Sequence, residues 1–470
     1  MSQKSRVLLR GQLSFLFLLA IIFLLPIPLG SNRPWAWNFF QLLIFSLGLQ
    51  LCVVDRVKLG ETFKIYRTSI FLFLAFIIIS AIQIIPLPYS ILDVVSPSSA
   101  STYKSFGASF GYISVDQGQS TITLFKTLSL FILFLVVLTI TNNEVRVRLL
   151  LATMLASGTF QAVYGAFEVL SGIEKSLVHQ LPVTDIATGS FVYKNHYANF
   201  LMLCLCAGIG LIVAALQNQR YSSIRDFIRI FARTILSSKA IIRICIVVMV
   251  IALVMSRSRM GNIAFFSSMT VTAIISLFLI KKRSQGMYIL IISMFVIDLF
   301  IVSAYFGLEK VQERLTQTNI TQESRDEVYS DAIGIVSDYP LLGTGGGSFY
   351  TIFPGYQRSN VSGFYDQAHN DYLQFVIEFG LIGSLFLGLL TLLALFSALR
   401  AMRKRRNPIL KGASFGCSMA IFGMGIHILV DFPLQAYGNT AYFVALLALS
   451  FLVLNIKIEP KNKSTLEYFS

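Results

Sequence analysis

The sequence predicts an all-α integral membrane protein with about twelve transmembrane helices and a long, partly helical loop before the tenth. Hydrophobic residues make up 55% of the 470 residues and charged residues only 13%, whereas charged residues usually make up about 25% of a soluble domain. The apolar residues gather in runs of roughly 20, the length that crosses a bilayer core of about 30 Å. The basic residues gather in alternate connections between those runs.

Twelve apolar runs are long enough to cross a membrane. They lie at residues 12–30, 36–54, 69–88, 122–140, 148–170, 196–216, 240–256, 261–280, 287–306, 372–398, 413–431 and 440–456. The first run follows three basic residues but lacks the small-residue cleavage site of a secretory signal, so we expect a retained helix. All five cysteines fall within or beside the runs. They are expected to be small packing residues rather than disulfide partners or metal ligands.

The distribution of Lys and Arg predicts that both termini are cytoplasmic. With the N-terminus inside, the inner segments and the helix ends beside them hold 27 of the 38 basic residues, as the positive-inside rule requires. The net charge of +15 therefore reflects topology and contact with anionic membrane lipid rather than binding to nucleic acid. The inner segments are residues 1–11, 55–68, 141–147, 217–239, 281–286, 399–412 and 457–470.

The outer face then receives the segments 89–121, 171–195 and 307–371. The last has 65 residues, which exceeds an ordinary connection and predicts a structured loop domain. The chain is accordingly divided into helices one to nine over 1–306, the loop domain over 307–371 and helices ten to twelve over 372–470.

Two features are expected inside the long loop. Apolar Val328, Ala332, Ile335 and Val336 recur at helical spacing, which predicts a short amphipathic helix over 324–337 that lies against the membrane or the helix bundle. The glycine-rich stretch at residues 343–347 follows it. That stretch is either a simple turn or a backbone nest that cradles phosphate.

Basic residues on the outer side need an explanation, because the positive-inside rule disfavours them. Arg257 and Arg259 lie where the seventh run ends and the eighth begins. Side chains two positions apart on a helix point about 200° away from each other, so at most one of these two arginines faces a given cavity. That arginine is a candidate for binding an anion, or both anchor the helices at the interface. The outer basic residues are Arg33, Lys104, Lys126, Lys175, Lys194, Arg257, Arg259, Lys310, Arg314, Arg325 and Arg358.

His369 stands at the outer end of the tenth run. Asn370 or Asp371 supplies the N-cap of that helix, and Gln374 and Glu378 follow four residues apart on one face. A carboxylate within a bilayer must face protein or water, so this polar stripe is expected to point inward. His369 is then either an interfacial anchor or a general base at the mouth of a polar cavity.

A third polar stretch precedes the sixth run. Lys194, Asn195 and His196 lie at its outer rim. Such residues are common interfacial anchors, and they are also candidates for contact with a polar ligand.

Four stretches carry a resemblance to a known family. They are FVYKNHYANFL at 191–201, SRSRMGN at 256–262, SRDEVYSDAIGIVSDYPLLGTGGGSF at 324–349 and AHNDYLQFVIEFGLIG at 368–383. In this order, with twelve helices and a long outer loop, they resemble the O-antigen ligase-related family of bacterial envelope proteins. That family includes O-antigen ligases, Wzy-type polysaccharide polymerases and oligosaccharide transferases to protein.

The resemblance assigns roles to individual residues. The family's catalytic histidine falls on His369, the arginine of its S-R segment on Arg259 and its loop arginine on Arg325. Lys194 stands where the pattern commonly has Arg, and Met260 where Gly is usual. The expected substrate-binding residues are Arg257, Lys194, Asn195, His196, Asn370, Gln374 and Glu378.

The resemblance implies a glycosyltransferase of the bacterial inner membrane. It would move a glycan from an undecaprenyl-diphosphate carrier to an acceptor hydroxyl, either another glycan or lipid A–core, at the periplasmic face. Fixed arginines would stabilise the diphosphate that leaves and His369 would accept the proton, with inversion of configuration. No Asp-x-Asp metal signature appears in the outer loops, so no metal or other cofactor is expected.

Alternatives to the ligase activity remain open at this point. A polymerase that extends a carrier-linked chain is one, with a chain-length regulator as a candidate partner. A transporter of the same lipid-linked glycan, which performs no bond chemistry, is another.

Overall fold

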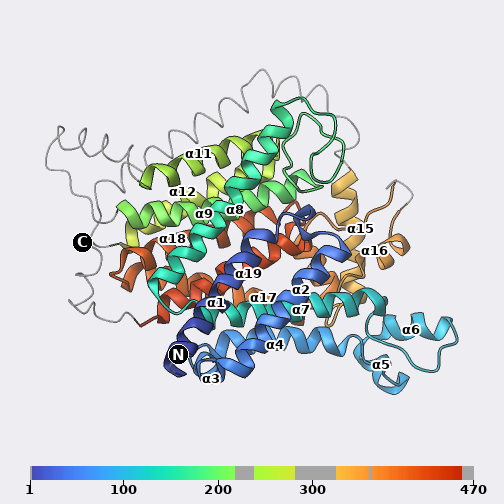
Figure 1. Ribbon diagram of the computed structural model, residues 1–470. Helices are drawn as coiled ribbons and strands as arrows, with labels where there is room; N and C mark the ends of the chain where they lie inside the picture. Colours follow the sequence, from blue (N-terminus) through green and yellow to red (C-terminus); the bar gives the residue numbers. More distant parts are fainter. Residues whose placement is uncertain (1–2, 217–237, 281–323, 359–362, 458–470) are drawn as a thin grey trace.

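The structure is a computed structural model that describes residues 3–216, 238–280, 324–358 and 363–457. Within these ranges every regular element is a helix, apart from two isolated β-bridges. Figure 1 shows long helices that run side by side as one bundle, with the short helices α5, α6, α15 and α16 gathered toward one end. The prediction of an all-α fold is confirmed for the described residues.

Eleven of the twelve predicted runs coincide with helices. The helices are α1 (Gln3–Leu24), α2 (Pro34–Val54), α4 (Arg67–Ile82), α7 (Gln117–Ile140), α8 (Glu144–Leu170), α9 (Lys194–Leu216), α11 (Ser238–Met255), α12 (Arg259–Leu279), α17 (Asp371–Lys404), α18 (Pro408–His427) and α19 (Tyr437–Asn455). The ninth run, 287–306, lies outside the described residues. Eight described helices are long and apolar enough to cross a membrane, or nine if the bent pair α3–α4 counts as one span. The total of twelve therefore stays a prediction.

Shorter helices fill several connections. They are α3 (Arg56–Ile65), α5 (Tyr89–Val95), α6 (Pro97–Ser105), α15 (Ser324–Asp338), α16 (Phe349–Ile352) and the 3-10 turns η1 (Leu29–Ser31), η3 (Phe353–Gly355) and η4 (Pro433–Gln435). Helix α15 confirms the amphipathic helix expected in the long loop. Val328, Ala332 and Ile335 are buried in a small core that includes Ile377 of α17, so this helix lies against the bundle. Residues 307–323 lie outside the described part of the loop.

Helix α9 is the centre of the bundle, because nearly every one of its residues is buried. It crosses α18 with backbone in contact with backbone. A Cβ atom added to Gly412 would lie 2.1 Å from the carbonyl oxygen of Gly210, and one added to Gly416 would lie 2.5 Å from that of Cys206. Small residues at such crossings let helix axes approach closely and gain van der Waals contact, which is the main attraction between helices in lipid. The buried cysteines fit the expected packing role.

Two arginines at the end of the bundle opposite to His369 satisfy helix C-termini. Arg146 donates from Nη1 to the carbonyl of Ile140, the last residue of α7, at 2.7 Å. Arg405 donates from Nε to the carbonyl of Val453 in the last turn of α19 at 2.8 Å. The last carbonyls of a helix have no partner in the helix and carry partial negative charge. Arginines therefore stabilise this end, whose cytoplasmic location stays a prediction.

Helix α17 is interrupted at Gly380, which has a non-helical φ of 65° and ψ of −177°. An interruption inside a membrane leaves backbone groups that must find partners in protein. Residues 340–345 supply them through four hydrogen bonds: Thr344 N–H to Ile377 O (2.8 Å), Gly345 N–H to Glu378 O (3.0 Å), Leu381 N–H to Pro340 O (2.9 Å) and Ile382 N–H to Leu341 O (3.2 Å). The long loop and the tenth predicted helix therefore form one unit.

We predict that Gly412→Ala destabilises the protein. The new methyl group would overlap the Gly210 carbonyl, so α9 and α18 must move apart, at a cost of roughly 1–3 kcal/mol. The thermal midpoint of the purified protein in detergent, followed by fluorescence-detected gel filtration, should fall.

The matched control is Gly388→Ala on α17. A Cβ atom there meets nothing within 4 Å, and alanine favours a helix by up to about 1 kcal/mol over glycine. This variant should be as stable as the parent or more so. Equal midpoints for the two variants would contradict the close crossing.

Candidate active site

The segments assigned to the outer face meet at one end of the bundle. The amide of Ala187 donates to the carbonyl of Met255 at 3.1 Å, and the amide of Asp371 donates to that of Ile428 at 3.1 Å. Asn439 donates from Nδ2 to the carbonyl of His196 at 2.9 Å. Four connections that are distant in sequence thus lie together.

His369 is positioned by the start of α17. Asn370 is the N-cap, and its side chain accepts a hydrogen bond from the Leu373 amide at 3.1 Å, as the sequence predicts. His369 itself has a φ of 51°, and its carbonyl accepts a hydrogen bond from the Tyr329 hydroxyl at 2.9 Å. Non-glycine residues in the left-handed region cost about 1–3 kcal/mol and persist where the surroundings enforce them. The backbone at His369 is therefore held in place by α15 and α17.

Phe432 brings two imidazoles together. Its ring centroid is 4.7 Å from that of His369 and 5.0 Å from that of His196, with both pairs nearly perpendicular. Tyr193 stacks on Phe432 at 5.4 Å, and Asn195 donates from Nδ2 to the Tyr193 hydroxyl at 2.8 Å. Two of the predicted site residues, His196 and Asn195, thus join His369 through aromatic contacts.

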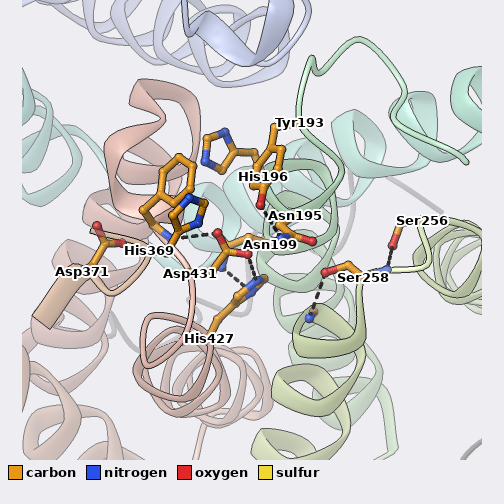
Figure 2. Close-up of polar contacts among 12 residues, drawn as sticks. Tyr193, Asn195, His196, Asn199, Ser256, Ser258, His369, Asp371, His427 and Asp431 are labelled. Carbon is orange, nitrogen blue, oxygen red and sulfur yellow. Dashed lines mark hydrogen bonds and ion pairs between the residues drawn. The ribbon is translucent and has the colours of Figure 1, made fainter. Parts of the chain in front are cut away.

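An acidic residue lies within this cluster. Asp431 is 1% exposed, and in Figure 2 its carboxylate lies between the imidazoles of His369 and His427. Its Oδ2 is 3.8 Å from Nε2 of His427, whose Nδ1 is 3.1 Å from Nδ2 of Asn199. Burial alone would raise the pKa of Asp431, but the contact with His427, the Phe432 amide and the nearby His196 together lower it. These contacts therefore favour the carboxylate form of Asp431.

The connection between α18 and α19 is fastened to α17 by Asp371, which is fully buried. Its Oδ2 accepts a hydrogen bond from the Leu434 amide and its Oδ1 one from Nε2 of Gln435, both at 2.9 Å. Since Phe432 and Asp431 lie in the same connection, Asp371 fixes their position relative to His369.

The polar stripe of α17 points inward, as the sequence predicts. Gln374 is 1% and Glu378 2% exposed. Gln374 accepts a hydrogen bond from the Ala368 amide and donates one to Glu378, both at 3.0 Å. Glu378 also accepts one from the Gly347 amide at 2.8 Å. Both side chains therefore hold neighbouring backbone, and their contact with substrate stays a prediction.

The glycine-rich stretch 343–347 is bonded to the bundle. Its amides from Thr344 to Gly347 all donate within the protein: the first two fill the break in α17, Gly346 donates to Oε1 of Gln83 at 3.2 Å and Gly347 to Glu378. A phosphate nest needs free amides. This stretch is therefore a structural turn rather than a phosphate cradle.

The arginine pair lies in the turn between α11 and α12, which Figure 2 marks by Ser256 and Ser258. Ser258 caps α12. Arg257 has a φ of 50°, and its Nη1 is 2.6 Å from a carboxylate oxygen of Asp185. Arg259 is the first residue of α12 and is exposed. The structure therefore pairs Arg257 with an acidic side chain and leaves the Arg259 side chain open to solvent.

Two other predicted site residues can be placed only in part. Lys194 begins α9 and is half-buried. Arg325 lies in the first turn of α15, but its side chain lies outside the described residues. Since α15 packs on α17, the backbone of Arg325 stands at the same end of the bundle as His369.

Comparison with protein families identifies the central part of the chain. Residues 244–388 match the family model for O-antigen ligase. The resemblance carried by the motifs is therefore confirmed over this segment, which contains Arg257, Arg259, Arg325 and His369. No curated protein matches the chain.

Much of the cluster lies outside the O-antigen ligase match. His196 precedes it, and His427, Asp431 and Phe432 follow it. His427 and Asp431 were missed in the sequence because the eleventh apolar run was taken to extend to residue 431, and Phe432 directly follows that run. The signal that would have found them is the pair His427 and Asp431, four residues apart at the outer end of that run.

We predict that Asp371→Asn loosens the connection between α18 and α19. An amide side chain has one acceptor oxygen, so one of the two buried donors in that connection loses its partner, at a cost of roughly 1–3 kcal/mol. Amide deuterium exchange in a peptide that covers residues 428–436 should become about 10- to 100-fold faster.

The control is Asp93→Asn, which removes a charge from an exposed pair with Lys104 far from this connection. Exchange over residues 428–436 should be unchanged. Parent-like exchange in Asp371→Asn would show that other contacts hold the connection.

Proposed function

We propose that this protein transfers an oligo- or polysaccharide from an undecaprenyl-diphosphate carrier to an acceptor hydroxyl at the outer face of the bacterial inner membrane. The donor, the acceptor and the face of the membrane are parts of the proposal. The observation that carries it is the O-antigen ligase match together with the histidine at the start of α17, which lies in a cluster of polar and aromatic side chains at one end of the bundle.

His369 is proposed as the general base. An imidazole has a pKa near neutrality and accepts a proton efficiently from a hydroxyl that is attacking. The Asp431 carboxylate, buried beside the imidazoles, would favour the imidazolium that forms. Direct attack of the acceptor oxygen on the anomeric carbon would then invert its configuration, because the bond to the diphosphate breaks on the opposite side.

Arg259 and Arg325 are proposed to stabilise the departing diphosphate. Arg259 stands in the first turn of α12, where the partial positive charge of the helix N-terminus also attracts anions. A guanidinium binds phosphate oxygens in pairs and stays charged throughout the reaction. These residues would stabilise the negative charge of the leaving diphosphate, so the diphosphate need not be protonated as it departs.

We predict that His369→Ala lowers glycan transfer by about 10²- to 10⁴-fold, the usual contribution of a general base. Transfer would be measured with purified protein, a defined undecaprenyl-diphosphate glycan and candidate acceptors, followed by sizing of the products. The matched control is His179→Ala, since His179 contacts the carbonyl of Ile27 at 3.1 Å and is assigned no part in the reaction. Undiminished transfer by His369→Ala would overturn the assignment.

We predict that Arg259→Ala and Arg325→Ala each reduce turnover more than Arg257→Ala does. Loss of a charge that stabilises a leaving group costs about 10²- to 10³-fold, whereas Arg257 is already paired with Asp185. The same reconstituted assay gives the ranking. Turnover that depends most on Arg257 would show that this arginine, rather than Arg259, binds the diphosphate.

The same assay separates ligase from polymerase. A ligase yields glycan joined to lipid A–core or another acceptor, whereas a polymerase yields longer chains still attached to the carrier lipid. We place the ligase activity first, and a chain-length regulator belongs to the polymerase alternative.

The break in α17 is the one observation that favours a transporter, because discontinuous helices are typical of transporter sites. In those sites the freed backbone groups bind the substrate or ion. Here four of those groups are bonded to residues 340–345 of the same chain, so the break serves the fold instead.

A further inference from the structure

The connection between α4 and α7 carries a small module of its own. Helices α5 and α6 enclose a core of Leu92, Ala100 and Ile113, and the backbones of Leu87 and Gly111 exchange hydrogen bonds of 2.8 and 3.1 Å. Figure 1 shows this α5–α6 module projecting beyond the ends of α4 and α7, away from the rest of the bundle. The module is folded, and it overhangs the edge of the bundle.

Large apolar side chains are exposed on this module. Phe106 is 82% and Val94 80% exposed, values unusual for such residues in a folded segment facing water. Three more are nearly half exposed: Ile85, Ile91 and Phe110. Its charged residues Lys104 and Asp93 are paired with each other at 2.6 Å, which lowers the cost of placing this surface near lipid.

We propose that the α5–α6 module is an interfacial anchor whose exposed apolar side chains insert into the lipid leaflet beside the bundle. Its occupant is the membrane that surrounds α4, because the two are continuous: Phe71 and Ile78 of α4 are 63% and 56% exposed, and six residues separate α4 from α5. Aromatic and large aliphatic side chains are typical of protein surfaces at this depth of a bilayer. The module therefore rests at the headgroup boundary.

The anchor is joined to the segment that fills the break in α17. Ser98 donates from Oγ to the carbonyl of Asp338 at 2.9 Å, and Leu342 packs against the core of the module. The Val115 amide, just after the module, donates to the carbonyl of Thr344 at 2.8 Å. The depth of the module in the membrane thus sets the depth of residues 338–344. The coupling would hold His369 at the depth of a lipid-linked diphosphate. Only this last step rests on the proposed function.

Tryptophan fluorescence in lipid tests the anchor without any measurement of transfer. Phe106→Trp or Val94→Trp is placed in a Trp35→Phe, Trp37→Phe background, which removes both native tryptophans, and is reconstituted in nanodiscs of phosphatidylethanolamine and phosphatidylglycerol. We expect at least twofold quenching by lipids brominated near the headgroup end of the acyl chain, and little quenching by aqueous iodide. The control is Ile333→Trp on α15, a 57% exposed residue that should respond to iodide.

Two other quenching results would overturn the anchor. Quenching of the tryptophans introduced by Phe106→Trp and Val94→Trp by iodide alone would place the module in water, and quenching by neither agent would show that protein covers it. The coupling is tested with Val94→Asp/Phe106→Asp, which should expel the module from lipid and speed deuterium exchange over residues 338–347 several-fold. Unchanged exchange in this double variant, with bromolipid quenching of the two tryptophan variants intact, would refute the coupling alone.

Discussion

A helix that breaks inside a membrane exposes amide and carbonyl groups that lipid cannot satisfy, and α17 breaks at Gly380. Residues 340–345 lie in the break and satisfy these groups, because their backbone forms hydrogen bonds with α17 on both sides of Gly380. Glycine is required on both partners: a Cβ atom at Gly380 would lie 2.2 Å from the Leu341 carbonyl oxygen, and one at Gly343 2.5 Å from the Glu378 carbonyl carbon. The rest of the outer end is arranged around this junction.

Several side chains reinforce the same junction. Gln83, fully buried after α4, donates to the carbonyls of Leu342 and Glu378 at 2.7 Å each. Lys126 of α7 lies 3.7 Å from the centroid of the Trp37 ring and close enough to Glu378 for their charges to interact. A carboxylate and an amide buried this deeply would be costly without such partners. Because α17 begins with the turn that carries His369, this network gives the candidate base a rigid support.

The candidate site is built from segments far apart in the chain. It therefore combines residues inside the O-antigen ligase match with residues outside it. The O-antigen ligase match supplies His369 and the arginines. The walls come from elsewhere: His196 and Tyr193 from the start of α9, and Phe432 from the connection after α18. Some buried polar atoms here, Nε2 of His196 and Oδ1 of Asn199 among them, have no hydrogen-bond partner in the described part of the chain.

The sequence by itself determined whatever depends on neighbours within one or two helical turns. Apolar runs, the buried face of α15, the Asn370 cap and the inward direction of Glu378 are of this kind, because helical periodicity and the cost of charge in lipid act locally. Only the tertiary structure decided which backbone groups bond residues 343–347, that α17 breaks, and that Asp431 and Phe432 stand beside His369. Those facts rest on contacts between residues tens to hundreds of positions apart, and the hydrophobic pattern of one chain contains no signal for which distant segments meet.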